Sequence, residues 1–387
     1  MILENTEKLE AAYSLRAAAQ KISNNKFLIG FDGFVDQIIH VVNTRLSVDE
    51  YTRVDTIKAF GERIISASGK SANIELVSQV EKIGGNGPLM ASAVYGAGSE
   101  VTMVGLFGYP DILPVFNPLV DQYKLITCGN PGATDALEFN DGKLMLGKLN
   151  TLKDLTWKRI CDVIGEDKFI SMLLEQKLVA ITNWTMLVGL SEIIDKIIEK
   201  IPDHSGLTFF FDLADPEKRL KSEIAYVIKQ MTALNKKAKC ILGINLREAE
   251  QISEVLNLSE PIEDGVAGLE VLSKRLKNKI GIHGIVIHSV SFAGATIANE
   301  SVAVQGPFCS SPKITTGAGD HFNGGFCAAL MGGLSLKSVL IVGVATSGWY
   351  VRGGGPSPKL EDTAALLESW AKNTLTDELP QTVATAL

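Results

Sequence analysis

The pattern of apolar and polar positions along the chain predicts an alternation of strands and helices. Residues 4–22 carry apolar side chains at helical spacing, and residues 26–31 form a short apolar run typical of a buried strand. From residue 150 onward the two kinds of segment alternate regularly. Strands are expected at 178–182, 207–212, 239–244 and 283–288, and helices at 187–200, 216–233, 246–254 and 266–277. This repeat predicts an α/β fold, a three-layer α/β/α sandwich around a mainly parallel sheet.

Three segments do not fit this parallel rhythm. Residues 37–46 and 73–80 alternate as strands do, and 133–149 have the pattern of a hairpin around Asn140-Asp141-Gly142. We interpret them as a small β-sheet lid, made of 37–83 and 133–149 with a helical insertion near 48–67. The main unit would then comprise residues 1–36, 84–132 and 150–387. Its remaining elements are expected at 89–97, 101–106, 294–304, 319–331 and 335–351.

Composition and charge exclude several classes of protein. The chain has 387 residues, of which 46% are hydrophobic and 21% charged, so it can form a large core. A net charge of −7 without a basic stripe argues against a nucleic-acid partner. The apolar stretch at 339–351 is too short to span a bilayer, so no membrane role is expected. Five scattered cysteines without metal-site spacing, and a start without signal-peptide character, predict a reduced, cytoplasmic protein.

Residues 313–326 hold the strongest candidate chemistry. A β-branched run leads into Gly317, Ala318 and Gly319, and an apolar helix follows. Small residues at a helix N-terminus expose backbone N–H groups that can bind an anion such as a transferring phosphoryl group. Asp320 comes next and could accept a proton from an attacking hydroxyl. The alternative is a structural turn in which Asp320 only caps the helix.

Two further carboxylates follow the first predicted strand. Asp32 and Asp36 come after residues 26–31, where open α/β sheets bind ligands. Asp32-Gly33 could equally be a simple turn, whereas Asp36 lies within an apolar run. Asn183 and Asp212 end later strands in the same way and are open to either interpretation.

Three motifs, and their order along the chain, resemble those of the ribokinase-like (PfkB-type) carbohydrate kinase family. The resemblance covers about residues 26–360. The first is Thr315-Thr316-Gly317-Ala318-Gly319-Asp320, followed by Phe322 and Gly325. The second is Gly84-Gly85-Asn86-Gly87, and the third is Asn245-Leu246-Arg247-Glu248. The first is specific, while the other two gain weight from their order and spacing.

The resemblance implies a role for each matching residue. Asp320 would be the catalytic base, and the backbone of Gly317, Ala318 and Gly319 the anion hole. Asp36 would bind sugar hydroxyls, with Asp32 as a possible stand-in because the interval from Gly30 is one residue longer than usual. Glu248 would hold Mg²⁺ near the phosphates of ATP. The remaining implied contacts are Gly85 and Asn86 to the sugar, and Asn245, Ser289, Gly294, Thr316 and Gly353 to the nucleotide.

The chain departs from the family pattern at three places. Leu89 stands where the family usually has an asparagine that contacts the sugar, so the substrate need not be ribose. Ile314 stands where the family often has an aspartate that helps bind potassium, which leaves a monovalent-cation requirement open. On the nucleotide side, Ser291-Phe292-Ala293-Gly294 keeps only the final glycine of the usual loop.

We therefore predict an ATP-dependent kinase that phosphorylates a hydroxyl of a sugar or sugar-like small molecule. A nucleoside kinase of the same fold, and a non-catalytic sugar-binding regulatory relative, remain alternatives. Retention of both Asp320 and Glu248 argues against the second, since binding alone needs neither. A dinucleotide-dependent oxidoreductase is disfavoured because no Gly-x-Gly-x-x-Gly follows the first strand. Exposed lid edges could pair two copies into a homodimer.

Overall fold

The larger of two sheets forms the centre of the molecule. The computed structural model describes residues 3–258, 260 and 265–380; the ends of the expected main unit, 1–2 and 381–387, lie outside them. Nine strands run in the order β14-β13-β12-β11-β10-β9-β1-β5-β6. The parallel strands are β1 (Lys26–Gly30), β5 (Glu100–Leu106), β6 (Lys124–Gly129), β9 (Leu178–Ile181), β10 (Thr208–Asp212), β11 (Lys239–Asn245) and β12 (Gly284–His288). The antiparallel hairpin β13 (Phe292–Ile297) and β14 (Glu300–Gln305) extends one edge.

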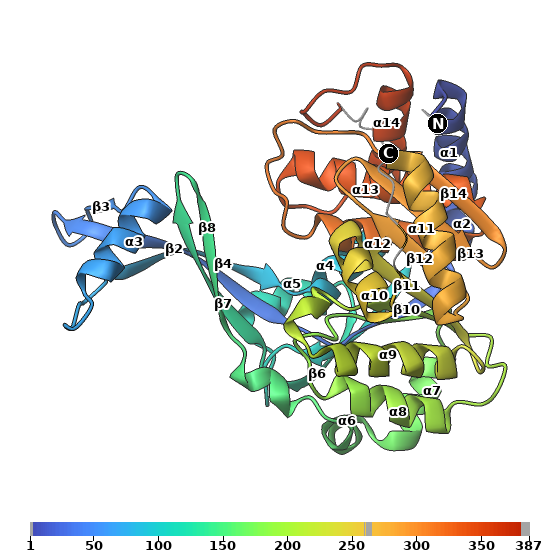
Figure 1. Ribbon diagram of the computed structural model, residues 1–387, viewed down its shortest axis with the longest axis horizontal. Helices are drawn as coiled ribbons and strands as arrows, with labels where there is room; N and C mark the ends of the chain where they lie inside the picture. Colours follow the sequence, from blue (N-terminus) through green and yellow to red (C-terminus); the bar gives the residue numbers. More distant parts are fainter. Residues whose placement is uncertain (1–2, 259, 261–264, 381–387) are drawn as a thin grey trace.

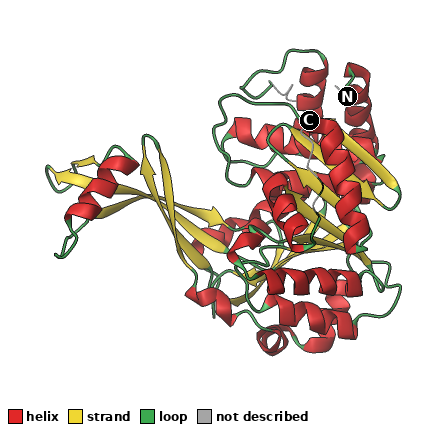
Figure 2. Cartoon of the chain, viewed as in Figure 1, coloured by secondary structure: helices red, strands yellow, loops and turns green. Residues whose placement is uncertain are grey.

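Helices cover both faces of this sheet (Figure 2). One face packs against α6 (Trp157–Ile164), α7 (Glu166–Leu174), α8 (Leu190–Lys200), α9 (Lys221–Leu234), α10 (Leu246–Val255) and α11 (Gly265–Ile280). The other packs against α1 (Asn5–Ala17), α4 (Asn86–Gly96), α12 (Ala318–Gly332), α13 (Leu336–Gly353) and α14 (Leu360–Ala371). Short helical segments are α2 (Ala19–Ser23), α5 (Asn117–Val120), η1 (Pro114–Phe116), η2 (Asn150–Asp154) and η3 (Pro216–Lys218). The expected three-layer α/β/α sandwich is confirmed.

Sequence patterns located most of these elements but not all of them. The parallel strands after residue 150 lie within a residue or so of the expected ranges. β6, α6, α7 and α14 were not expected. Only the last two residues of β6 are buried, so its sequence lacks the continuous apolar run of a central strand. Within the described residues, no helix has the length and apolarity needed to cross a membrane.

A second, five-stranded sheet projects from the side of the main body (Figure 1). It is built from β2 (Phe34–Arg45), β4 (Leu76–Gly84), β7 (Gly132–Phe139), β8 (Gly142–Lys148) and the short β3 (Tyr51–Arg53). β2 lies between β4 and β7, and β7 pairs with β8. β2 begins at residue 34 rather than 37, so Asp36 lies inside this sheet and not at the end of the first strand.

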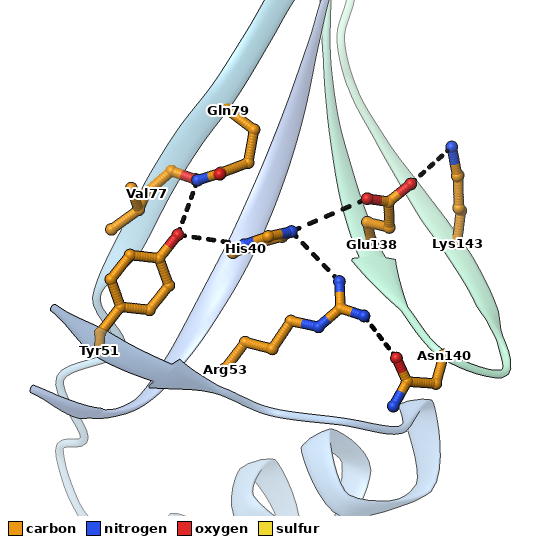
Figure 3. Close-up of polar contacts among 8 residues, drawn as sticks. All are labelled: His40, Tyr51, Arg53, Val77, Gln79, Glu138, Asn140 and Lys143. Atoms are coloured by element: carbon orange, nitrogen blue, oxygen red, sulfur yellow. Dashed lines mark hydrogen bonds and ion pairs between the residues drawn. The ribbon is translucent and has the colours of Figure 1, made fainter.

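The insertion within this sheet contains a shorter helix than expected. Instead of a helix over 48–67, the chain forms β3 and then α3 (Ile57–Ser66). Phe60 of α3 and Phe139 of β7 pack in a separate apolar cluster, with ring centroids 5.5 Å apart. Polar contacts fasten β3 beside it (Figure 3): the Tyr51 hydroxyl lies 3.1 Å from His40 Nδ1, and Arg53 Nη1 lies 3.2 Å from His40 Nε2. The distal end of the sheet therefore has its own small core.

Candidate active site

The N-terminus of α12 is the turn expected to bind phosphate. Gly317 is its N-cap with φ 91°, a backbone conformation that residues with a side chain rarely adopt. A Cβ on Gly317 would lie 2.9 Å from both Leu89 Cδ1 and the Tyr350 hydroxyl, so glycine is required there. The N–H of Ala318 donates to the Thr315 carbonyl at 3.1 Å. Because the Ala318 N–H is already used, an anion bound here would accept hydrogen bonds from the N–H groups of Gly317 and Gly319.

Asp320 lies in the first turn of α12 and is only 7% exposed. Its Oδ1 accepts a hydrogen bond of 2.9 Å from the Asn86 amide. Burial, together with the carboxylates of Asp32 and Glu248, raises the pKa of Asp320 to about 7, while the Asn86 hydrogen bond opposes this rise. A carboxylate with such a pKa can accept a proton near neutral pH.

Asp32 is completely buried and fully engaged within the protein. Its carboxylate accepts hydrogen bonds from the backbone N–H groups of Asn86 (2.8 Å) and Gly87 (2.7 Å) at the start of α4. The Thr182 hydroxyl (3.0 Å) and the Asn183 amide (2.9 Å), both after β9, donate as well. With four donors on two oxygens, Asp32 anchors α4 and hence Asn86 beside Asp320. This geometry does not suit the substrate contact expected for Asp32.

Asp36 lies in the second sheet, where a glycine on the neighbouring strand makes room for its side chain. It lies in β2 opposite Lys82 of β4, and a Cβ on Gly84 would lie 2.3 Å from its Oδ2. Gly84 thus leaves the space that the Asp36 side chain occupies. Burial raises the pKa of Asp36, and a hydrogen bond with Thr134 opposes this rise. The side chain is half-buried, against Gly84 and near enough to Asp32 to feel its charge.

A second carboxylate pair lies at the ends of β10 and β11. Asp212 accepts hydrogen bonds from the Asn323 amide (3.0 Å) and the Ala214 N–H (2.9 Å). Glu248 accepts from the N–H groups of Asp215 (2.7 Å) and Asn245 (2.9 Å), while the Asn245 side chain caps α10. Burial, Glu248 and Asp320 raise the pKa of Asp212 well above its usual range, and burial raises that of Glu248.

A cavity of about 440 Å³ opens beside α12. Of the residues predicted to contact the nucleotide, Asn245 and Ser289 lie in its wall, together with Ala318 and Gly319 of the predicted anion hole. Gly294, Thr316 and Gly353 do not. Gly294 instead packs under α11, where a Cβ would lie 2.9 Å from Leu269, and the Thr316 carbonyl accepts a hydrogen bond from Tyr350. Apolar residues make up much of the rest of the wall: Leu246, Val290, Phe292, Pro307, Pro312, Phe322, Val344 and Val351.

Known proteins identify the family. A profile of the prokaryotic ketohexokinase family matches residues 3–370. This chain belongs to that family. A ketohexokinase of Haloferax volcanii is 30% identical over 357 residues, which cover 90% of this chain and 92% of that protein. The protein is thus an ATP-dependent carbohydrate kinase, which transfers the γ-phosphoryl group to a hydroxyl of a sugar.

Solved structures share the fold at low sequence identity. Arabidopsis thaliana ribokinase complexed with ribose and ATP superposes with a TM-score of 0.62 at 13% identity, covering 89% of this chain and 99% of its own. A nucleoside kinase of Methanocaldococcus jannaschii gives a TM-score of 0.58, also at 13% identity, with coverages of 90% and 99%. The resemblance to ribokinase-like kinases and the fold class are therefore both confirmed.

Sequence reasoning missed Thr182 of this ketohexokinase-family site, and it named Asn183 and Asp212 only as strand-end candidates without a role. Thr182 and Asn183 hold Asp32, and Asp212 adds a carboxylate near Asp320. Their only sequence signal is their place at the ends of predicted strands, which is shared by residues without function. Leu89, where the family usually has a polar residue, packs against Gly317 at the N-cap of α12. No local pattern indicates that contact, because it joins α4 to α12.

Proposed function

We propose that this kinase phosphorylates a ketohexose, with Asp320 as the catalytic base. The observation that carries this assignment is the position of Asp320: it is buried, held by Asn86, and directly follows Ala318 and Gly319, which line the 440 Å³ cavity. The substrate class follows the name of the Haloferax volcanii relative, which is a ketohexokinase. Asp36 and Asn86, from lid and main body, would contact sugar hydroxyls.

In this proposal each group has one task. ATP occupies the cavity with its terminal phosphate toward Gly317 and Gly319, whose N–H groups stabilise charge on the transferring group. Asp320 accepts the proton of the sugar hydroxyl as that oxygen bonds to phosphorus and the bond to the β-phosphate oxygen breaks. The lid carrying Asp36 excludes water, which otherwise competes with the sugar as acceptor.

We also propose Mg²⁺ as the metal, near Glu248 and Asp212. The described residues contain no group of three or more side chains able to hold a metal directly, so the ion would keep several waters, as Mg²⁺ does with nucleotides. The fit is electrostatic: Asp212, Glu248 and Asp320 repel one another, which helps to raise the pKa of Asp212. When bound, Mg²⁺ neutralises charge on the phosphates during transfer.

The decisive test is ADP release with Mg-ATP on ketohexoses, aldohexoses, pentoses and nucleosides. Asp320→Asn should reduce kcat on the preferred ketohexose by about 10³. Asp203→Asn is the matched control: this exposed carboxylate precedes the amino end of β10, whereas Asp212 lies at its carboxyl end, and the substitution should leave kcat unchanged. Turnover on nucleosides alone would replace the sugar with a nucleoside. Binding of sugar without turnover would favour the non-catalytic alternative.

We further propose a homodimer through the lid. Ile38 pairs with Val80 and Ala136, and Ala136 pairs with Met145, so an apolar row crosses four strands. Because neighbouring residues of a strand point to opposite faces, this row lies on the face away from α3, which covers Ile39 and Leu137. Val80 and Met145 are 53% and 52% exposed. Ala136 is already buried, so a second copy placed against this row would cover chiefly its exposed members, Val80 and Met145.

We place this activity in the cytoplasm, where ATP is available as donor. All five cysteines are free thiols in the structure, and three of them are buried. Free buried cysteines suit a reducing compartment. Localisation of a tagged copy by fractionation tests this assignment.

A further inference from the structure

A loop without helix or strand forms one wall of the proposed nucleotide cavity. Residues 306–313, here the donor loop, connect β14 toward α12. Gly306, Pro307, Cys309 and Pro312 of this loop line the cavity. A loop of this kind binds a ligand well only if other parts of the protein hold it in its binding conformation.

The donor loop is held by a buried arginine. Arg352, in the last turn of α13, is 1% exposed. Its guanidinium donates to the carbonyl oxygens of Pro307 (3.1 Å) and Phe308 (2.6 Å) in the donor loop, and of Gly348 (2.9 Å) in α13. Its Nε donates to the Thr376 carbonyl at 2.7 Å. Arg352 therefore connects the donor loop to α13 and to residues 376–378, here the C-terminal segment.

The C-terminal segment also contacts the donor loop directly. Asp377 accepts hydrogen bonds from both the backbone N–H (2.9 Å) and the hydroxyl of Ser310. Glu378 forms a more exposed ion pair with Lys313, with the charged atoms 2.7 Å apart. The family profile ends at residue 370, so this segment lies beyond the part of the chain that defines the family.

The chemistry of these contacts favours a role in holding the loop. Burial lowers the pKa of Arg352, so keeping its charge inside the protein has a free-energy cost. Four of the five N–H donors that an arginine carries are used on backbone carbonyls, which is an arrangement that fixes chain geometry. Asp377 adds a charge-assisted pair of bonds to Ser310, two residues further along the loop than Phe308.

We propose that Arg352 and residues 376–378 are positioning elements for the phosphoryl donor, holding the donor loop in its ATP-binding shape. This inference rests on the assignment of the 440 Å³ cavity to the nucleotide. These residues act through the loop and do not touch the sugar site around Asp36 and Asp320. Their loss should weaken ATP binding and leave kcat and the KM for the sugar nearly unchanged.

The test compares two truncations of the full chain. Ending the protein after residue 373 removes the whole contacting segment, whereas ending it after residue 380 leaves the segment in place and is the control. We expect the KM for ATP to rise about tenfold in the first truncation, with kcat and the sugar KM within about twofold of wild type. Asp377→Ala in the full chain should also raise the KM for ATP selectively, but by a smaller factor. Arg352→Lys, which cannot reach all the carbonyls, should also raise the KM for ATP.

The outcomes separate this inference from the proposed function. Wild type without ATP turnover would contradict the kinase assignment itself. An active wild type with an unchanged KM for ATP in a truncated protein of normal circular dichroism overturns the positioning role. An equal rise in the KM values for ATP and for sugar, or a fall in kcat alone, also overturns the positioning role. Either result would indicate that the truncation makes the whole active site less rigid and does not act on ATP binding in particular. If the truncation does not fold, Asp377→Ala decides by the same criteria.

Discussion

At the scale of single residues, the site assigns different roles to four carboxylates of similar chemistry. Asp32 receives four hydrogen bonds and is fully buried, so it anchors α4. Asp36 packs against Gly84, Asp320 accepts a hydrogen bond from Asn86 in the first turn of α12, and Glu248 takes part in the capping box of α10. Because surroundings decide what a carboxylate does, these roles are separable by mutation.

The pKa of Asp320 predicts the pH dependence of the enzyme. A base must be ionised to accept a proton, so kcat/KM for the sugar should fall as pH drops through about 7. Asn86→Ala removes the hydrogen bond that lowers this pKa, and the inflection should move to higher pH. Rates measured between pH 5.5 and 9 at saturating Mg-ATP check this. A profile that stays flat across neutrality would contradict Asp320 as base.

Asp32 and Asp36 should respond differently to the same substitution. Asp32→Asn places an amide among buried donors, which should lower the free energy of unfolding by about 2 kcal/mol. Asp36→Asn should leave stability unchanged but raise the sugar KM about tenfold, as expected for a lost charge-assisted contact. Denaturant titrations and sugar KM values measure the two effects. If Asp32→Asn selectively raised the sugar KM in a stable protein, the two roles would have to be exchanged.

At the scale of elements, the N-terminus of α12 depends on glycine for its shape. Gly317→Ala should lower stability by about 1–3 kcal/mol through backbone strain, and it should also lower kcat because the new Cβ collides with Leu89 and Tyr350. Gly98→Ala is the matched control: φ there is +102° but no atom lies within 4 Å of the new Cβ. It should cost stability without affecting kcat. Equal kinetic effects from both substitutions would argue against the turn as anion site.

At the scale of the whole molecule, the apolar row of the lid predicts a dimer. Val80→Glu with Met145→Glu places charges at two exposed positions of that row. Light scattering after size exclusion should show a dimer for wild type and a monomer for this double variant, since charges disrupt an apolar interface. Leu174→Glu, an exposed apolar position on α7, is the control. A wild type that is monomeric at high concentration would exclude the proposed interface.

Local patterns were sufficient to predict the layered α/β architecture and the glycine turn that starts α12. Strands buried on both faces appear as short apolar runs, and helices repeat every 3.6 residues, so each signal lies within one stretch of chain. The same holds for residues 315–320, where turn, helix start and carboxylate are adjacent. The order of these elements, and the motifs on them, are properties of the sequence alone.

Only the tertiary structure decided which groups from distant parts of the chain contact one another. It placed Asp32 among donors from residues 86, 87, 182 and 183, and packed the Asp36 side chain against Gly84. It also brought Arg352 and Asp377 against the donor loop. Such contacts join segments far apart in the chain, and a carboxylate or guanidinium looks the same in sequence whether buried, bonded or free. Their roles depend on three-dimensional neighbours, which local patterns do not encode.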